Sequence, residues 1–338
     1  MADFLIPILA FTTFLFAALT TRLLIGFLRK RGVIDIPNER SSHVVPTPRG
    51  GGLAIILAFL LASLAMLYFK PAEYLPGISF WSGLVLVAIT SLLDDRFNLP
   101  VYIRFALHLA AAVFVSLATG GFQKFPLPEP YSFDLGVFNH PLTIFWILAV
   151  LNIYNFLDGI DGYAAVQGLV ACIGIALLNP LGMEYDLSIL LAASIAGFLI
   201  YNWHPAKIFM GDIGSASLGF IFASLPLYFT NVSVNIGVFS MGIFLWFFLA
   251  DGAFTIIRRI LKGEKIWVAH RTHIYQRLVI KGYSHATVAF AIMLTGLIVV
   301  LVYIVLYQFY PAYLLVSFAV AGLLFIGLFL FEYLNKKG

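Results

Sequence analysis

The sequence predicts an all-α, polytopic integral membrane protein. Of its 338 residues, 62% are hydrophobic and only 11% are charged, a balance that soluble domains do not show. Apolar runs of about 17–25 residues, each long enough to cross a bilayer, recur from one end of the chain to the other. Because so little of the chain lies between these runs, residues 1–338 are expected to form a single transmembrane domain.

The apolar runs predict eleven transmembrane helices. They cover residues 4–28, 51–69, 78–93, 101–119, 140–157, 163–178, 187–203, 214–230, 236–256, 286–308 and 312–334. The third and sixth runs are the short ones. A cleaved signal peptide is not expected, because Arg29, Lys30 and Arg31 follow the first run instead of preceding it.

Positive charges predict how these helices are oriented. Basic residues directly after the first run hold that end in the cytoplasm, so the N-terminus is expected outside and the C-terminus inside. Lys70 and Lys124 are the only Lys or Arg residues in the expected outer segments. Those segments also hold six acidic residues: Asp3, Glu73, Glu129, Asp134, Glu184 and Asp186. This distribution accounts for the net charge of +4 without nucleic acid as a partner.

The chemistry-bearing residues gather in the inner connections. These connections cover residues 29–50, 94–100, 158–162, 204–213 and 257–285. A channel or transporter is expected to place its key polar groups near the membrane midplane instead. Carboxylates that converge on one membrane face suggest a divalent metal and a phosphorylated substrate.

The segment from Phe209 to Ser215, FMGDIGS, is the most specific of these motifs. Asp212 could hold Mg²⁺, which takes one or two carboxylates together with substrate phosphates. Gly214 and Ser215 open the next span, and the free N–H groups of a helix start suit a phosphate. Phe209 could stack on a base, although packing at the membrane interface explains Phe209 taken alone.

An acidic pair, Asp94-Asp95, ends the third span. Two adjacent carboxylates repel each other, which favours a shared cation or proton. The alternative is a solvated helix end in which Arg96 is the partner.

The segment from Asn155 to Gly162, NFLDGIDG, closes the fifth span. Its glycines permit a tight turn and a close approach of the backbone to a ligand. Asn155, Asp158 and Asp161 then supply polar groups around that turn. A plain polar hairpin between two helices would need neither the two aspartates nor the preceding asparagine.

Two further inner segments carry histidine or a lone acid. His270, Arg271 and His273 fit phosphate contact and charge stabilisation, or else a basic loop that touches anionic lipid. Zinc is not expected there, because cysteine is absent nearby and aspartate is distant in sequence. Asp251 is open between a buried structural acid and a member of the metal site.

The first inner loop contains His43 and Arg49 ahead of three glycines. The glycines can form a backbone concavity for an anion. The alternative is a loop that simply leads into a helix.

Together, these motifs resemble the polyprenyl-phosphate N-acetylhexosamine-1-phosphate transferase superfamily, glycosyltransferase family 4. The resemblance rests on PTPRGGG (46–52), DDR (94–96), NFLDGIDG (155–162), NWHPAKIFMGDIGS (202–215) and HRTHIYQ (270–276), in this order. It extends over nearly the whole chain.

The resemblance implies a phosphotransferase of the bacterial inner membrane with its active site on the cytoplasmic face. Such an enzyme transfers a sugar-1-phosphate from a UDP-N-acetylhexosamine to undecaprenyl phosphate and releases UMP. It depends on Mg²⁺, with Mn²⁺ as a substitute. The enzyme is expected to lie in membrane lipid; a homodimer is one option, and the sequence leaves the oligomeric state open.

The resemblance also implies roles for individual residues. Asp212 matches the metal ligand. The catalytic positions are Asp94, Asp95, Asp158, Asp161, His270, Arg271 and His273. The substrate-binding positions are His43, Arg49, Asn155, Asn202, Lys207 and Phe209, of which Asn202 and Phe209 line the uridine pocket.

One departure from the family pattern bears on the sugar. Tyr275 and Gln276 stand where the translocases of peptidoglycan synthesis and the GlcNAc-1-phosphate transferases carry histidines. The form HRTHIYQ resembles enzymes that initiate O-antigen or related lipopolysaccharide glycans with UDP-FucNAc or UDP-QuiNAc. It argues against a MurNAc-pentapeptide donor and leaves GlcNAc open.

Two other classes compete with this interpretation. A secondary transporter of an anionic metabolite explains the spans but not the one-sided acids, and the motifs show no internal repeat. A CDP-alcohol phosphotransferase would follow Asp-Gly with Ala-Arg, whereas Asp158-Gly159 is followed by Ile-Asp-Gly.

Overall fold

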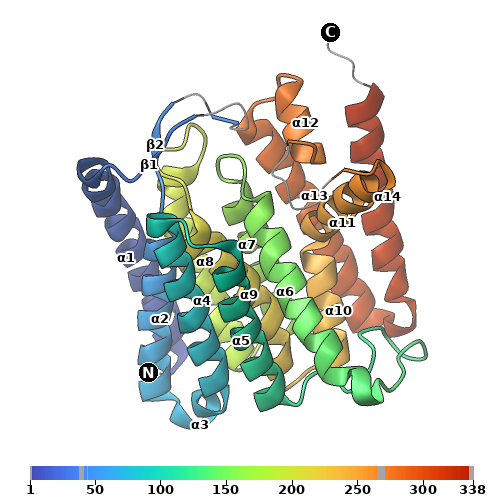
Figure 1. Cartoon of the computed structure of the whole chain (residues 1–338). Helices are drawn as coiled ribbons and strands as arrows, with labels where there is room; N and C mark the ends of the chain where they lie inside the picture. Colours follow the sequence, from blue (N-terminus) through green and yellow to red (C-terminus); the bar gives the residue numbers. More distant parts are fainter. Residues whose placement is uncertain (1, 38–41, 44, 265–270, 335–338) are drawn as a thin grey trace.

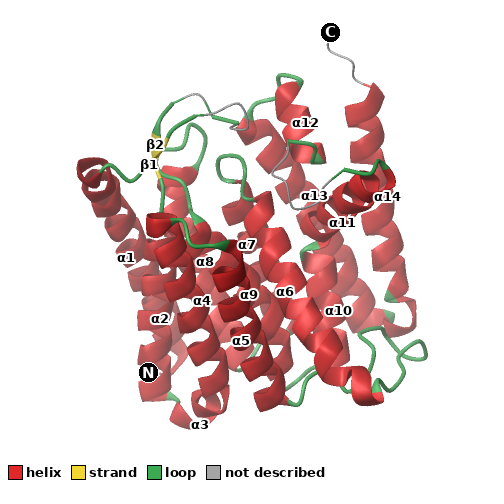
Figure 2. Cartoon of the chain, viewed as in Figure 1, coloured by secondary structure: helices red, strands yellow, loops and turns green. Residues whose placement is uncertain are grey.

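The computed structural model describes residues 2–37, 42–43, 45–264 and 271–334. Within them, helices make up almost all of the regular structure (Figure 2). The two ends of the chain lie at opposite ends of the helix bundle (Figure 1). The first inner loop adds a two-residue antiparallel pair, β1 (Ile34–Asp35) with β2 (Thr47–Pro48).

The long helices follow the predicted apolar runs in order. They are α1 (Ala2–Arg31), α2 (Gly52–Phe69), α4 (Ile78–Phe97), α5 (Val101–Thr119), α6 (Asn139–Leu157), α7 (Tyr163–Leu178), α8 (Met183–Asn202), α9 (Asp212–Ser224), α10 (Val234–Phe244), α11 (Trp246–Leu261), α13 (His285–Phe309) and α14 (Leu315–Leu334). Two short helices, α3 (Pro71–Tyr74) and α12 (Ile274–Ile280), lie in connections.

The described chain contains eight helices that are long and apolar enough to cross a membrane, or nine if the α10–α11 pair counts as one span. The protein is therefore a polytopic all-α membrane protein. Two predicted spans form shorter helices, α7 with 16 residues and α9 with 13. The count of eleven spans and the orientation of the termini stay predictions.

The ninth predicted span, 236–256, is wrong as a single straight helix. The structure divides it into α10 and α11, which meet at an angle of 76°. Leu245 lies between them with φ −99° and ψ 15°, outside the helical range. Both halves are apolar, so hydropathy gives no sign of the break.

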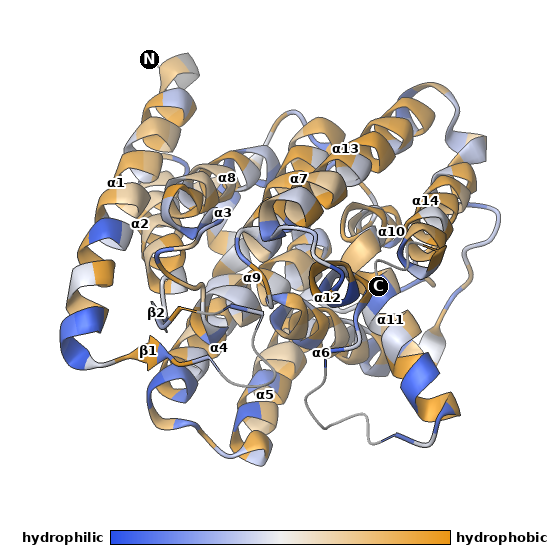
Figure 3. Cartoon of the chain, turned by 90° about the horizontal axis from the view of Figure 1, so that it is seen from above, coloured by the Kyte–Doolittle hydropathy of each residue, from blue (hydrophilic) through white to orange (hydrophobic). Residues whose placement is uncertain are grey.

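Helix α9 lies at the centre of the bundle, against α2, α4 and α6 (Figure 1). All its residues after Asp212 are buried, which is why a short helix can remain there without contacting lipid. Outer helices instead expose large apolar side chains, such as Leu23 and Phe27 on α1. Figure 3 looks along the bundle and shows hydrophobic residues dominating the helices, with hydrophilic residues gathered at the ends of α1 and α11.

The starts of α2 and α9 touch each other through glycine. A Cβ atom at Gly52 would overlap the backbone of Gly214 and lie 2.9 Å from the Met210 carbonyl oxygen. These are backbone atoms, so no side chain can move aside. The contact fixes the start of α9, and with it Asp212, against the first inner loop.

Gly52→Ala is therefore expected to destabilise the protein by about 1–3 kcal/mol, the usual cost of overpacking. The melting temperature of the purified protein in detergent measures this. Gly26→Ala is the matched control, because nothing lies within 4 Å of a Cβ atom at that position. Equal melting temperatures for the two variants would contradict the proposed contact.

Candidate active site

Two inner loops are joined by backbone hydrogen bonds. The N–H of Phe209 donates to the Pro48 carbonyl at 2.8 Å, and the N–H of Gly51 donates to the Phe209 carbonyl at 2.9 Å. The Gly52 N–H donates to the Met210 carbonyl at 2.8 Å. The glycine-rich motif thus runs beside the FMGD motif and brings the first inner loop next to the start of α9.

A carboxylate from α4 caps the start of α9. Asp95 accepts the N–H groups of Asp212 and Ile213, each at 3.0 Å. Free N–H groups at a helix start favour a negative charge. Gly211, which precedes them, has φ +74°, and a Cβ atom there would lie 2.7 Å from Asp95 Oδ2. Glycine at this position lets Asp95 reach the helix.

Two arginines neutralise the acidic residues around Asp212. Arg49 pairs with Asp212 Oδ1 and, through Nε at 2.9 Å, with Asp95. Arg104 lies 2.5 Å from Asp94 Oδ2 and 3.5 Å from Asp212 Oδ2. Burial lowers the pKa of Arg49, but the charges of nearby aspartates, above all Asp212 and Asp95, outweigh that effect and raise it. Arg49 therefore stays charged beside Asp212.

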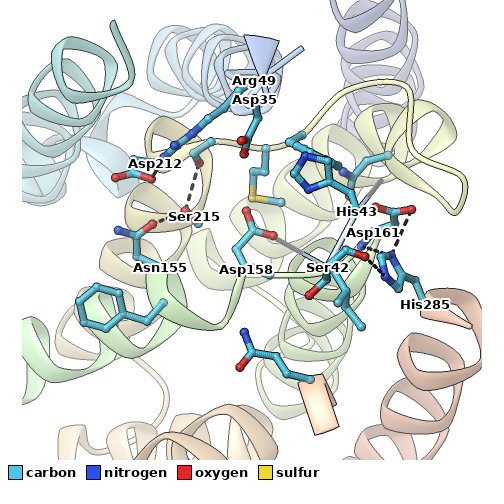
Figure 4. Close-up of a pocket in the computed structure, with 18 of the residues that line it drawn as sticks. Asp35, Ser42, His43, Arg49, Asn155, Asp158, Asp161, Asp212, Ser215 and His285 are labelled. Carbon is cyan, nitrogen blue, oxygen red and sulfur yellow. Dashed lines mark hydrogen bonds and ion pairs between the residues drawn. The ribbon is translucent and has the colours of Figure 1, made fainter. Parts of the chain in front are cut away.

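Arg49, Arg104 and Asp212 border a pocket of about 530 Å³. Eight of the predicted site residues line it: His43, Arg49, Asn155, Asp158, Asp161, Asn202, Phe209 and Asp212. Figure 4 shows Asp212 and Asn155 on one side of this pocket and Asp161 on the other. Residues more than 160 positions apart in the chain, such as Arg49 and Asp212, thus meet in one cavity.

Asp94 and Asp95 are not among the described residues that line the pocket. Asp94 is buried, accepts the Leu99 N–H at 2.8 Å, and holds Arg104. Asp95 is also largely covered by the start of α9 and Arg49. The acidic pair therefore lies outside the pocket lining, where it positions Asp212 and the two arginines.

Other predicted residues lie outside the pocket lining. Lys207 is exposed, and His270 falls outside the described residues. Arg271 and His273 are described but are not among the lining residues. His273 is buried, with its Nδ1 at 3.5 Å from Asp251.

Asp251 is a buried structural acid in this arrangement. Its carboxylate accepts the Ile274 N–H at 3.0 and 3.1 Å and the Thr255 hydroxyl at 3.2 Å. It thereby holds the start of α12 against α11. Of the two interpretations of Asp251 left open by the sequence, the structure favours the structural one.

The end of α6 and the turn that follows it bring Asn155 and Asp158 into the pocket. Asn155 Oδ1 accepts the Ser215 hydroxyl at 2.6 Å, which ties α6 to α9. Burial raises the pKa of Asp158 to about 7; Arg49 opposes this rise, and the neighbouring aspartates, Asp212 first, add to it. Asp158 is thus an acidic group of the pocket that binds a proton near neutral pH.

The raised pKa predicts a pH-dependent stability. The folded protein holds the Asp158 proton more tightly than the unfolded chain does. In the unfolded chain, the Asp158 carboxyl has a pKa of about 3.9. The stabilisation is complete below that value and is lost as the pH rises through about 7. We expect the melting temperature to fall between about pH 5 and pH 8, and to fall less in Asp158→Asn.

Asp134→Asn is the control for this experiment, because Asp134 is an exposed acid in the connection between α5 and α6. It should reproduce the pH profile of the wild type. The same slope in all three proteins would show that Asp158 does not carry the effect.

Asp161 joins three segments at the other side of the pocket. Its Oδ2 lies 2.6 Å from His204 Nδ1 and 3.3 Å from His285 Nδ1, and it accepts the Ala206 N–H at 3.1 Å. Burial raises the Asp161 pKa, but the hydrogen bonds from His285 and His204 more than offset this and lower it. Asp161 is therefore ionised at neutral pH.

Asn202 ties two of the same segments together. It accepts the Gly162 N–H at 3.1 Å and donates to the Ile208 carbonyl at 2.9 Å. The turn after α6 and the loop before α9 are thereby held side by side.

Sequence motifs do not single out several of the pocket residues. These are Arg104, His285 and Asp35. The one usable signal is at Arg104, a charged residue in the first turn of an apolar span, where charge is costly. His285 stands at the start of α13, more than 120 residues from Asp161, and nothing in their spacing relates them.

The pocket contains donors that suit a hard divalent cation. The carboxylates of Asp212 and Asp158 and the amide oxygen of Asn155 belong to its lining. Mg²⁺ prefers oxygen ligands of this kind and retains positions for substrate phosphates. These residues therefore fit the metal that the sequence motifs predict.

Comparison with known proteins identifies the family of the chain. A family model described as Glycosyl transferase family 4 matches residues 77–230, the stretch that carries Asp94 through Asp212. The probable undecaprenyl-phosphate N-acetylglucosaminyl 1-phosphate transferase of Bacillus subtilis is 34% identical over 280 residues, covering 80% of this chain and 76% of the relative. The chain belongs to the polyprenyl-phosphate N-acetylhexosamine-1-phosphate transferase family.

Other members of this transferase family are similar over most of the chain. The decaprenyl-phosphate N-acetylglucosaminephosphotransferase of Mycobacterium leprae is 33% identical, with 80% of this chain and 76% of the relative covered. A phospho-N-acetylmuramoyl-pentapeptide-transferase of Streptococcus pyogenes is 29% identical, with 66% of this chain and 73% of the relative covered. The resemblance shown by the motifs is thus confirmed at the level of the family.

Proposed function

We propose that the protein transfers an N-acetylhexosamine-1-phosphate from a UDP-sugar to undecaprenyl phosphate at the cytoplasmic face of a bacterial inner membrane. The observation that carries this proposal is the convergence of Asp212, Arg49 and Arg104 at one pocket. Two arginines beside a carboxylate suit a reaction between two phosphate-bearing substrates, because charge stabilisation is the main requirement of phosphoryl transfer.

The reaction joins the acceptor phosphate to the sugar-bearing phosphorus of the donor. An oxygen of the lipid phosphate forms the new P–O bond, the bond to the UMP oxygen breaks, and UMP leaves with that electron pair. Mg²⁺ held by Asp212, with Mn²⁺ as a substitute, would offset the charge of the donor phosphates. Arg49 and Arg104, which pair with the two carboxylate oxygens of Asp212, would bind phosphate oxygens.

The acceptor needs little help from a base. A phosphate monoester has a second pKa of about 6, so it has largely lost its second proton at neutral pH. Asp158, with a pKa of about 7, can accept a remaining proton. Phe209 offers a ring for the uracil, and in this structure that ring already packs edge-on against His43 at a centroid distance of 4.7 Å.

An apolar cavity of about 610 Å³ suits the prenyl tail of the acceptor. It lies among α6, α10, α11 and α14, at the bend between α10 and α11, with Trp146 and Trp246 in its lining. A polyisoprenoid chain buries favourably against such a surface.

The donor sugar is the finer part of the proposal. Gln276 lines the pocket, and Tyr275 is fully buried and stacks on Tyr163 at a centroid distance of 4.6 Å. These are the two positions where the related pattern has histidines, which favours UDP-QuiNAc or UDP-FucNAc and initiation of an O-antigen-type glycan. The names of the relatives above favour the alternative, UDP-GlcNAc for another envelope polymer.

The test is UMP release by the purified protein with undecaprenyl phosphate, Mg²⁺ and a panel of UDP-sugars. The panel contains GlcNAc, GalNAc, QuiNAc, FucNAc and MurNAc-pentapeptide donors. Turnover with a 6-deoxy sugar supports both parts of the proposal, whereas turnover with GlcNAc alone retains the reaction and discards the O-antigen assignment. No turnover with any donor by folded protein would overturn the proposed reaction.

A further inference from the structure

Asp161, His204 and His285 form a compact cluster at the side of the pocket away from Asp212, where Figure 4 labels Asp161 and His285. The three residues come from three segments: the turn after α6, the loop before α9 and the start of α13. Their ligand atoms, one from each residue, all lie within 4.8 Å of one another. The three donors can therefore surround a single ion with only small movements.

The hydrogen bonds of His285 determine where its proton lies. Its Nε2 faces the Ser42 carbonyl oxygen at 3.1 Å, and a carbonyl can only accept, so Nε2 carries the hydrogen. In the neutral ring, Nδ1 then presents its lone pair towards Asp161. The Asp161 N–H is 3.3 Å from Nδ1, beyond the usual range for N–H donors, and satisfies that lone pair poorly.

A cation would take the place of a proton in this cluster. When the His285 ring is doubly protonated, its Nδ1–H donates to the Asp161 carboxylate 3.3 Å away. The His204 Nδ1 faces the same carboxylate oxygen at 2.6 Å. Metal binding requires the neutral imidazole and the ionised carboxylate, so an ion bound among these three groups displaces the protons that otherwise join them.

This arrangement is the one that metal-binding histidines adopt. A ligating histidine commonly donates its other ring N–H to a backbone carbonyl or a carboxylate, which fixes the ring and its tautomer. In this protein, the Ser42 carbonyl accepts the Nε2–H of His285. Two imidazole nitrogens and one carboxylate also make up the protein ligands of a three-ligand zinc site with one open position.

We propose that Asp161, His204 and His285 form a second cation site, which binds Zn²⁺ or a similar nitrogen-preferring divalent ion. Imidazole ligands favour such ions over Mg²⁺, so this site is chemically distinct from the oxygen donors around Asp212. Because Asp161 and His285 line the pocket, the open position faces the cavity. If the proposed function holds, a bound ion there also hinders entry of the donor.

Calorimetric titration with Zn²⁺ tests the site in the full-length protein, purified in detergent without a histidine tag. We expect one Zn²⁺ per chain, with binding that persists in excess Mg²⁺. His285→Gln and Asp161→Asn should each weaken binding by at least about 10-fold, since even a residue that only orients a ligand contributes this much. Visible absorption of bound Co²⁺ reports the same ligands independently, and neither measurement requires turnover.

His140→Gln is the matched control. His140 lies at the other end of α6 from the turn that carries Asp161, and it hydrogen-bonds Ser116. This variant should bind Zn²⁺ as the wild type does. Melting curves for each variant establish that it is folded. Absence of stoichiometric binding to the folded wild type, or equal affinity in His285→Gln and His140→Gln, would overturn the proposal, whatever the outcome for UMP release.

Discussion

The Asp212→Asn variant is expected to lose sugar-phosphate transfer by at least about 100-fold while it remains folded. The substitution keeps the shape of the side chain and removes the charge that faces the pocket. Asp95 still caps α9, because it accepts backbone N–H groups that the substitution leaves in place. Arg49 and Arg104 keep Asp95 and Asp94 as partners. UMP release and the melting temperature together measure the effect.

The control is Asp134→Asn, which removes an exposed acid in the connection between α5 and α6 and should leave both quantities unchanged. Near-normal turnover of Asp212→Asn at saturating Mg²⁺ would rule out Asp212 as the metal ligand.

The Asp95→Ala variant is expected to lose stability as well as activity. Its carboxylate accepts two N–H groups of α9 at 3.0 Å and pairs with Arg49 at 2.9 Å; the Asp95 side chain is 5% exposed and that of Arg49 is 38% exposed. Removing the acceptor of a buried hydrogen bond typically costs about 1–3 kcal/mol. The start of α9 also loses its acceptor, so Asp212 shifts and transfer fails with it.

The matched control breaks an ion pair that is exposed. Lys124→Ala removes the contact with Glu129 at 2.8 Å in the connection between α5 and α6, and exposed pairs contribute little to stability. The melting temperature of Asp95→Ala should therefore lie well below that of Lys124→Ala. A melting temperature for Asp95→Ala equal to that of the wild type would refute the capping role.

The convergence of the inner motifs was predictable because each motif stands at the same end of a membrane helix. Alternation of spans brings such ends to one face, and the structure places Asn155, Phe209 and Asp212 in one pocket. The different roles of the acidic residues were not predictable. Asp94 and Asp95 lie next to Asp212 but outside the pocket lining. They can do so because the glycine at position 211 lets α4 approach the start of α9.

The bend between α10 and α11 and the contact of His285 with Asp161 depend on helix packing, which no sequence pattern indicates. The bend at Leu245 occurs within an apolar run, between two apolar stretches. His285 and Asp161 meet because α13 packs against α7, which follows the turn carrying Asp161. Hydropathy identifies helices and their ends, but it does not say which end touches which.

Because Gly52 and Gly214 bring two backbones together, the wall of the pocket that carries Asp212 has little freedom to adapt. Backbone in contact with backbone cannot change rotamer, so in the proposed reaction this wall would act as a fixed reference for the phosphates. Under the proposed function, adjustment to different donors falls to the side of the pocket away from Asp212, where His43 and His285 arrive on separate segments (Figure 4). Substitutions on that side should change the choice of sugar sooner than they change the chemistry.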